Sequence, residues 1–169
     1  MTATPSDFIH AMRHLPAGVT IVTAARGQQR NGFTAIAVCS VSAEPPHLLV
    51  CANREAETHG TIIASGHFAV NVLRADQAAL ADRFAGRTGF EGAARFIGGP
   101  WLKLPSGSPA LQNACAVFDC RVVERLSIAT HDVIIGEVTY VRAGSDCDAL
   151  AYVDRFYARA AKDIADPQS

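Results

Sequence analysis

Apolar and polar residues alternate along much of the chain, which is the pattern of half-buried β-strands. Between 116 and 124, Ala116, Phe118 and Cys120 share one face while Asp119 and Arg121 share the other. Similar β-branched or alternating runs predict further strands over 19–24, 33–42, 47–52, 68–73 and 133–142, with a last short strand or hairpin over 149–157.

Helical spacing is found in three short stretches. Phe8, Met12 and Leu15 line one face of a first helix, for which Ser6 is the expected N-cap. A second helix is predicted over 57–65, with Gly66 as its left-handed C-cap.

A third helix is expected after Asp76 as N-cap, where Leu80 and Phe84 stand four residues apart. Glycines and prolines scattered over 86–108 predict a loop, and residues from 158 onward read as briefly helical. Regular strand–helix alternation is missing, so the pattern argues against a Rossmann-type parallel sheet. We therefore expect a mainly β, antiparallel barrel with helical insertions, formed as a single domain over 1–169.

Charge balance and apolar run length argue against a nucleic-acid partner and a membrane-spanning helix. The 15 basic and 16 acidic residues leave a net charge of −1, whereas proteins that bind nucleic acids carry a basic surplus. No apolar run approaches the roughly 20 residues of a membrane-spanning helix. The N-terminal residues lack the basic and apolar regions of a secretory signal, so a cytoplasmic location is expected.

The five cysteines do not form a recognisable metal or redox motif. Their number is odd, no Cys-x-x-Cys occurs, and Cys115 and Cys120 would face opposite sides of one strand. We expect buried free thiols in a reducing compartment. His10 and His14 are spaced as a metal pair, but no third ligand lies nearby in sequence, and no metal site is predicted.

Standard nucleotide and nucleophile motifs are absent: there is no G-x-G-x-x-G, no P-loop and no G-x-S-x-G. The segment 31–42 is instead rich in small and hydroxyl side chains, which would let a flat aromatic ligand approach the strand. An ordinary strand packed on a neighbour explains the same composition.

Two further segments offer hydrogen-bond donors. Arg54, Thr58 and His59 surround a strand end and a helix start, where free N–H groups favour phosphate. Glu55 and Glu57 favour the alternative of a capped surface helix. His131 lies at a turn between two apolar strands, as a donor for a second ligand or as an exposed loop residue.

Together these segments resemble the flavin reductase-like family, the reductase components of two-component flavin monooxygenases. The similarity covers about residues 7–157. It is carried in order by Ala17-Gly18-Val19-Thr20-Ile21-Val22-Thr23; by Gly32-Phe33-Thr34-Ala35 with Ser40-Val41-Ser42 and Pro45-Pro46; by Asn53-Arg54, Thr58-His59, 68–73 and 82–86; and by His131-Asp132, 135–138, 150–152 and Phe156-Tyr157.

The resemblance implies a homodimeric FMN-binding split β-barrel with FMN or FAD at the subunit interface and NADH or NADPH as hydride donor. The residues implied to bind flavin are Thr34, Ala35, Ser40, Val41, Ser42, Asn53, Arg54, Thr58, His59, Phe84, Ala85 and Gly86. Those implied to lie near the nicotinamide nucleotide are His131, Asp132 and Tyr157.

The implied reaction is hydride transfer from the nicotinamide to the flavin, for which no general base is expected. Reduced flavin would then serve a partner monooxygenase. Alternatives are a flavoprotein reductase acting on ferric iron or a corrinoid, a non-catalytic flavin-binding protein, and a purely structural barrel.

Overall fold

The computed structural model describes residues 2–144 and 147–160 of the 169-residue chain. Twelve strands dominate it: β1 (Ala17–Gly18), β2 (Thr20–Arg26), β3 (Gln29–Ala35), β4 (Val38–Ala43), β5 (Pro46–Asn53), β6 (His67–Val72), β7 (Trp101–Lys103), β8 (Pro109–Leu111), β9 (Ala116–Ile128), β10 (His131–Ala143), β11 (Ala149–Val153) and β12 (Phe156–Ala160). The helical segments are α1 (Pro5–Met12), α2 (Glu57–Ser65), η1 (Ala75–Gln77), α3 (Ala78–Phe84) and η2 (Gly92–Phe96).

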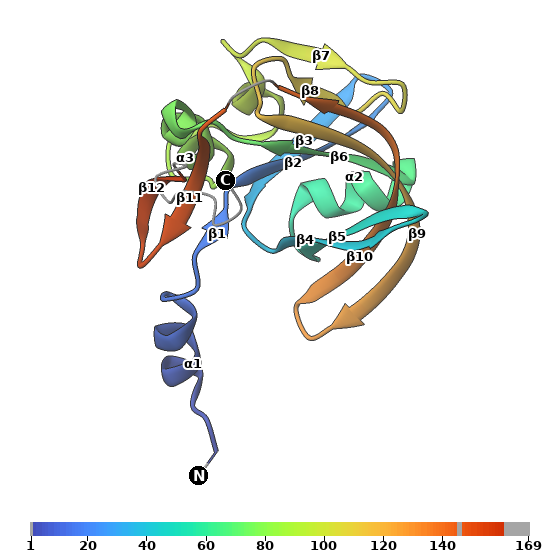
Figure 1. The fold of residues 1–169 in the computed structure, drawn as a ribbon. Helices are drawn as coiled ribbons and strands as arrows, with labels where there is room; N and C mark the ends of the chain where they lie inside the picture. The colour runs from blue at the N-terminus through green and yellow to red at the C-terminus, as the bar shows by residue number, and fades with distance from the viewer. Residues whose placement is uncertain (1, 145–146, 161–169) are drawn as a thin grey trace, which may run out of the picture.

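A seven-stranded antiparallel sheet, ordered β3-β2-β6-β9-β10-β5-β4, forms the body of the molecule (Figure 1). Its edge strands, β3 and β4, follow one another in the chain with only Ile36 and Ala37 between them. Since so short a link spans at most about 11 Å, the sheet curls until its two edges approach each other. No ladder pairs β3 with β4, so the described sheet is a barrel that remains split along this line.

Two cores lie on opposite faces of the curled sheet. The interior core gathers inward side chains such as Val22, Phe68 and Ile134, and α2 adds Ile62. Gly136 faces this interior, where a Cβ would stand 2.6 Å from the Phe68 ring, so the close approach of β10 requires glycine. The outer core packs β2 and β6 against α3, η2, β8 and β11, through side chains that include Phe84.

Most predicted strands are confirmed, but two predicted segments are wrong. The predicted strand 33–42 is broken at Ile36 and Ala37, because the chain there crosses from one edge of the sheet to the other. The predicted loop 86–108 contains η2 and β7, which pairs with β8.

The helix caps also differ in part from expectation. Thr4, rather than Ser6, caps α1: the Asp7 amide donates to Thr4 Oγ1 at 3.2 Å. Asp76 lies inside η1, which precedes α3, and does not cap that helix. Gly66 has the predicted left-handed conformation, with φ 71°. Residues 158–160 belong to β12 rather than to a helix, and the rest of the predicted tail lies outside the described residues.

The prediction of five buried free thiols is wrong. Cys115 and Cys147 form a disulfide with a Cα–Cα distance of 5.5 Å. The β9–β10 hairpin explains this pairing, because it places the start of β9 beside the end of β10. Of the other cysteines, Cys39 is exposed, Cys51 is half-buried, and only Cys120 is buried. Burial raises the pKa of Cys120 to about 12.

Among the described residues, no helix has both the length and the apolar character needed to cross a bilayer.

Candidate functional site

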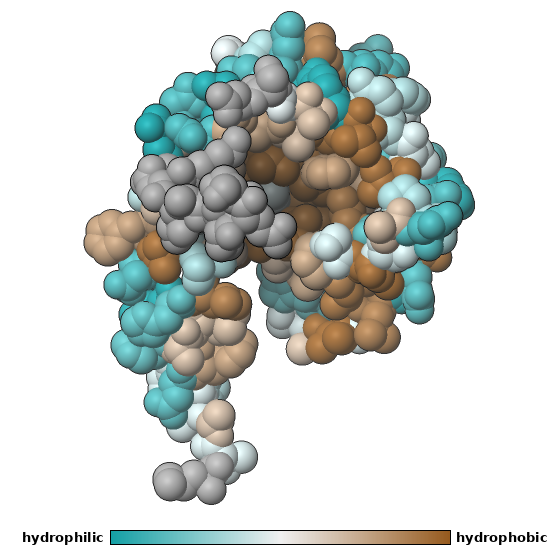
Figure 2. Space-filling view, in the orientation of Figure 1, coloured by the Kyte–Doolittle hydropathy of each residue, from teal (hydrophilic) through white to brown (hydrophobic). Residues whose placement is uncertain are grey.

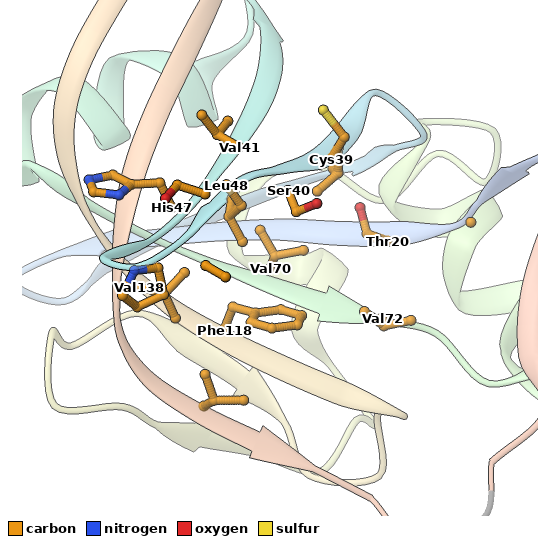
Figure 3. Close-up of a pocket in the computed structure, with 16 residues that line it drawn as sticks. Thr20, Cys39, Ser40, Val41, His47, Leu48, Val70, Val72, Phe118 and Val138 are labelled. Carbon is orange, nitrogen blue, oxygen red and sulfur yellow. The ribbon is translucent and has the colours of Figure 1, made fainter.

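A large cavity, of about 570 Å³, opens at one end of the split barrel between β4–β5 and β2–β6 (Figure 3). Ser40, Val41 and Ser42, predicted from sequence to bind flavin, all line it. Sequence reasoning missed the other walls, which are the inward faces of the alternating strands. They include Thr20, Leu48, Val70, Val72, Phe118, Val138 and Val141.

This large cavity is mostly apolar, with hydroxyls from Thr20, Ser40 and Ser42 at its wall. Among the described residues that line it, His47 alone has a side chain that can carry a positive charge. Such a cavity suits a flat aromatic ring with a polar edge, because the walls exclude water while a few polar groups fix orientation. The described part of the lining therefore offers a phosphate group no lysine or arginine.

A small pocket of about 170 Å³ lies beside the outer core. Thr34, Ala85 and Tyr157, three of the predicted ligand residues, line it together with Arg87 and Tyr152. The Tyr157 hydroxyl donates to Asp82 Oδ1 at 2.8 Å. Burial and the adjacent Asp82 carboxylate raise the pKa of Tyr157 to about 12, so it remains a neutral donor.

The large cavity and the small pocket flank the same two chain segments. Gly18 and Thr20 line the cavity, while Val19 between them lines the pocket. In the same way Val38 faces the cavity and Ile36 the pocket. The two hollows therefore adjoin the same part of the barrel rim.

The predicted flavin residues Thr34-Ala35 and Phe84-Ala85-Gly86 do not all face the same surface. Thr34 and Ala35 point to opposite faces of β3: Thr34 donates to the Ala81 carbonyl at 2.6 Å, whereas Ala35 joins the interior core. Phe84 is 1% exposed and packs in the outer core. Gly86 is exposed and has φ 76°.

The start of α2 forms a third hollow of about 310 Å³. Thr58 lines it and is buried, but two exposed carboxylates, Glu57 and Glu91, line it as well. Arg95 also lines it and donates to the Gly32 carbonyl at 3.1 Å. The carboxylates disfavour the phosphate that the sequence predicted here.

The other five predicted residues converge at the far end of the barrel. Asn53 at the end of β5 pairs with His131 at the start of β10, next to the β9–β10 turn. His59 of α2 approaches Asp132 through Nε2 and Oδ2, 2.7 Å apart. Arg54 contacts the turn itself, where its backbone N–H donates to the Thr130 carbonyl at 3.1 Å.

His131 is the first residue of β10, whereas Val138 and Val141, which line the large cavity, lie in the second half of the strand. Val138, which lines the cavity, is seven positions along the strand, so the two are about 20 Å apart at the usual rise per residue. Val38 is a nearer lining residue, because it pairs with Val50 and so aligns with Ile134, three positions from His131.

The sequence of residues 12–161 matches the family model described as the flavin reductase like domain. The chain belongs to this family. The predicted resemblance is confirmed, and so is the antiparallel split-barrel fold with helical insertions, which solved flavin reductases share.

Curated and solved relatives support the family assignment. The chain is 45% identical over 152 residues to "FMN reductase (NADH) RutF" of Variovorax paradoxus, covering 90% of this chain and 83% of that protein. The NADH:FAD oxidoreductase SgcE6 of Streptomyces globisporus has a TM-score of 0.84 and 29% identity, covering 99% of this chain and 95% of the other. BorF, the flavin reductase component of a bacterial two-component tryptophan halogenase, has a TM-score of 0.85 and 28% identity, covering 92% and 98%.

Proposed function

We propose that this flavin reductase family member uses NADH to reduce FMN and releases the reduced flavin to a partner monooxygenase in the cytoplasm. The observation that carries the proposal is the large apolar cavity with Ser40, Val41 and Ser42 in its wall. The curated relatives named NADH-dependent FMN reductases favour this pair of substrates. Two solved relatives favour the partner: BorF, the flavin reductase component of a two-component tryptophan halogenase, and nitrilotriacetate monooxygenase component B.

The proposed division of the flavin follows the chemistry of the two hollows. The large cavity would hold the isoalloxazine ring against its apolar walls, with the hydroxyls of Thr20, Ser40 and Ser42 near the ring edge. The ribityl phosphate would cross the rim toward the small pocket, where Arg87 supplies a guanidinium beside Thr34 and Ala85. When bound, FMN supplies the acceptor for the hydride of NADH.

His131 is proposed to contact the nicotinamide nucleotide. Its ring is exposed, and Nδ1 is hydrogen-bonded to Thr130 Oγ1 at 2.8 Å, which leaves Nε2 for a ligand. One such bond contributes roughly 0.5–1.5 kcal/mol when neutral and about 1.5–3 kcal/mol when charged.

We therefore expect His131→Ala to lower kcat/KM for NADH by roughly 2- to 150-fold. The FMN dissociation constant and the melting temperature should change little, because the side chain is exposed. Stopped-flow reduction of bound flavin across an NADH titration measures the effect. An identical NADH dependence in both proteins would remove His131 from the nucleotide site.

A homodimer is proposed because the sheet leaves an apolar face uncovered. The outward side of β5, β9 and β10 includes Leu49 and Val133, with Leu126 and Ile128 at 59% and 54% exposure. Figure 2 shows hydrophobic surface over this region, and α1 exposes Phe8 and other apolar residues on a helix that projects from the body. A sheet face of this kind normally packs against a second layer.

Light scattering should give about twice the 17.9 kDa chain mass. The second copy would also bring its own His131 close to this cavity. Mixing His131→Ala chains with chains whose cavity is blocked by Ser40→Trp should then restore activity, since one of the two shared sites in each mixed dimer is intact. A monomer that reduces FMN at full rate would refute the shared site.

A further inference from the structure

Asp132 is a buried carboxylate that the proposed ligand contacts leave unexplained. Its side chain is 1% exposed, and His59 Nε2 lies 2.7 Å from Oδ2. Arg125 Nε of β9 approaches the same oxygen at 3.6 Å. The hydrogen bond from His59 holds the pKa of Asp132 below its ordinary value, with smaller contributions from Ser127 and Arg125.

Asp132 and His131 point to opposite faces of the sheet. The side chain of Asp132 lies on the same inward face of β10 as Ile134 and Gly136, whereas His131 is exposed. A ligand on the exposed ring of His131 is therefore separated from the Asp132 carboxylate by the strand. The buried pair of His59 and Asp132 therefore contacts the β9–β10 turn from the inward face of the sheet.

Arg54 holds the same turn from the end of β5. Its backbone N–H donates to the Thr130 carbonyl at 3.1 Å, and its guanidinium donates to the Ala129 carbonyl. Ala129 has φ 49°, a conformation that costs an alanine free energy and that fixed contacts must maintain. Arg54, which follows β5, thus holds the carbonyls of Ala129 and Thr130. His59 of α2 holds Asp132, the first inward side chain of β10.

We propose that Arg54, His59 and Asp132 form a clamp that positions His131 for the nicotinamide nucleotide, rather than binding ligand themselves. The inference rests on the proposed role of His131. Arg54 and Asp132 restrain the turn on either side of Thr130 and His131, while Thr130 Oγ1 orients the ring through Nδ1. Without the clamp the turn can move, and the His131 ring can adopt several orientations. The hydrogen bond from His131 to the nicotinamide nucleotide is then weaker.

The test is a double-mutant cycle between the clamp and His131. His59→Leu removes the donor to Asp132, and we expect it to raise KM for NADH by most of the factor seen for His131→Ala, with kcat changing less. In the His131→Ala background, His59→Leu should have no further effect on KM. His59→Gln, which keeps an N–H donor, should recover part of the loss. Asp132→Asn provides an independent variant, and Glu55→Gln, exposed on the same loop, is the matched control.

Each outcome decides between two claims. If His131→Ala is itself without effect, the proposed nucleotide site fails before the clamp is tested, and the clamp proposal falls with it. If His131→Ala acts but His59→Leu multiplies its effect in the double variant, the pair is merely structural and the clamp is wrong. A raised FMN dissociation constant in His59→Leu or Arg54→Ala would place these residues in the flavin site instead. Melting temperatures measured in parallel separate unfolding from repositioning.

Discussion

Replacing Ser40 by tryptophan should weaken FMN binding by about 100-fold or more, which corresponds to roughly 2.7 kcal/mol. Ser40 lies on the edge strand β4, is exposed, and lines the large cavity. An indole there fills space proposed for the flavin ring without entering either core. Because β4 is an edge strand, the fold should tolerate the substitution.

Ser40→Ala is the matched control, since it removes the hydroxyl but leaves the cavity open. We expect it to change the FMN dissociation constant no more than a few-fold, the effect of one lost hydrogen bond. Quenching of flavin fluorescence gives both constants, and circular dichroism checks the fold. Unaltered FMN affinity in folded Ser40→Trp would move the ring out of this cavity.

Loss of the Cys115–Cys147 disulfide should lower the free energy of unfolding by about 3–4 kcal/mol. The bond joins residues 32 positions apart, and a loop of that length loses this much chain entropy in the unfolded state. Cys115→Ser in urea denaturation measures the loss. Dithiothreitol should destabilise the wild type by the same amount and leave Cys115→Ser unchanged.

Cys39→Ser serves as the control for stability, because Cys39 is exposed and outside the disulfide. Thiol titration of the unreduced, denatured chain should find three reactive groups. A count of five would mean that the two cysteines are reduced in the isolated protein, as the reductants of the proposed cytoplasmic location favour.

Local sequence patterns predicted the strands well where proline or glycine residues mark the ends of a strand. Pro45, for example, lies between β4 and β5, and Pro46 begins β5. The break at Ile36 and Ala37 carries no glycine or proline, and it exists only because the sheet must close on itself. The alternation that begins at Ala116 shifts near Val123, where the β9–β10 register is irregular. The prediction stopped at this shift, whereas β9 continues to Ile128.

The candidate site was predicted as a set of residues but not as an arrangement. Strict strand alternation already implies that Thr34 and Ala35, or His131 and Asp132, face opposite sides. A carboxylate in the inward row of Ile134 and Gly136 was a further signal, because a buried charge needs a partner. Its partner, His59, lies 73 positions away, and only the fold identifies it.

The pairing of β5 with β10 has a consequence for how the protein comes to be folded. This ladder joins positions about 80 to 90 residues apart, whereas β2–β3 and β9–β10 are local hairpins. Its closure therefore carries a larger entropic cost, and we expect it to come late. The cavity wall and the histidine turn both depend on it. We therefore expect a chain still emerging from the ribosome to form hairpins before it can bind flavin, and flavin to stabilise only molecules that have completed the sheet.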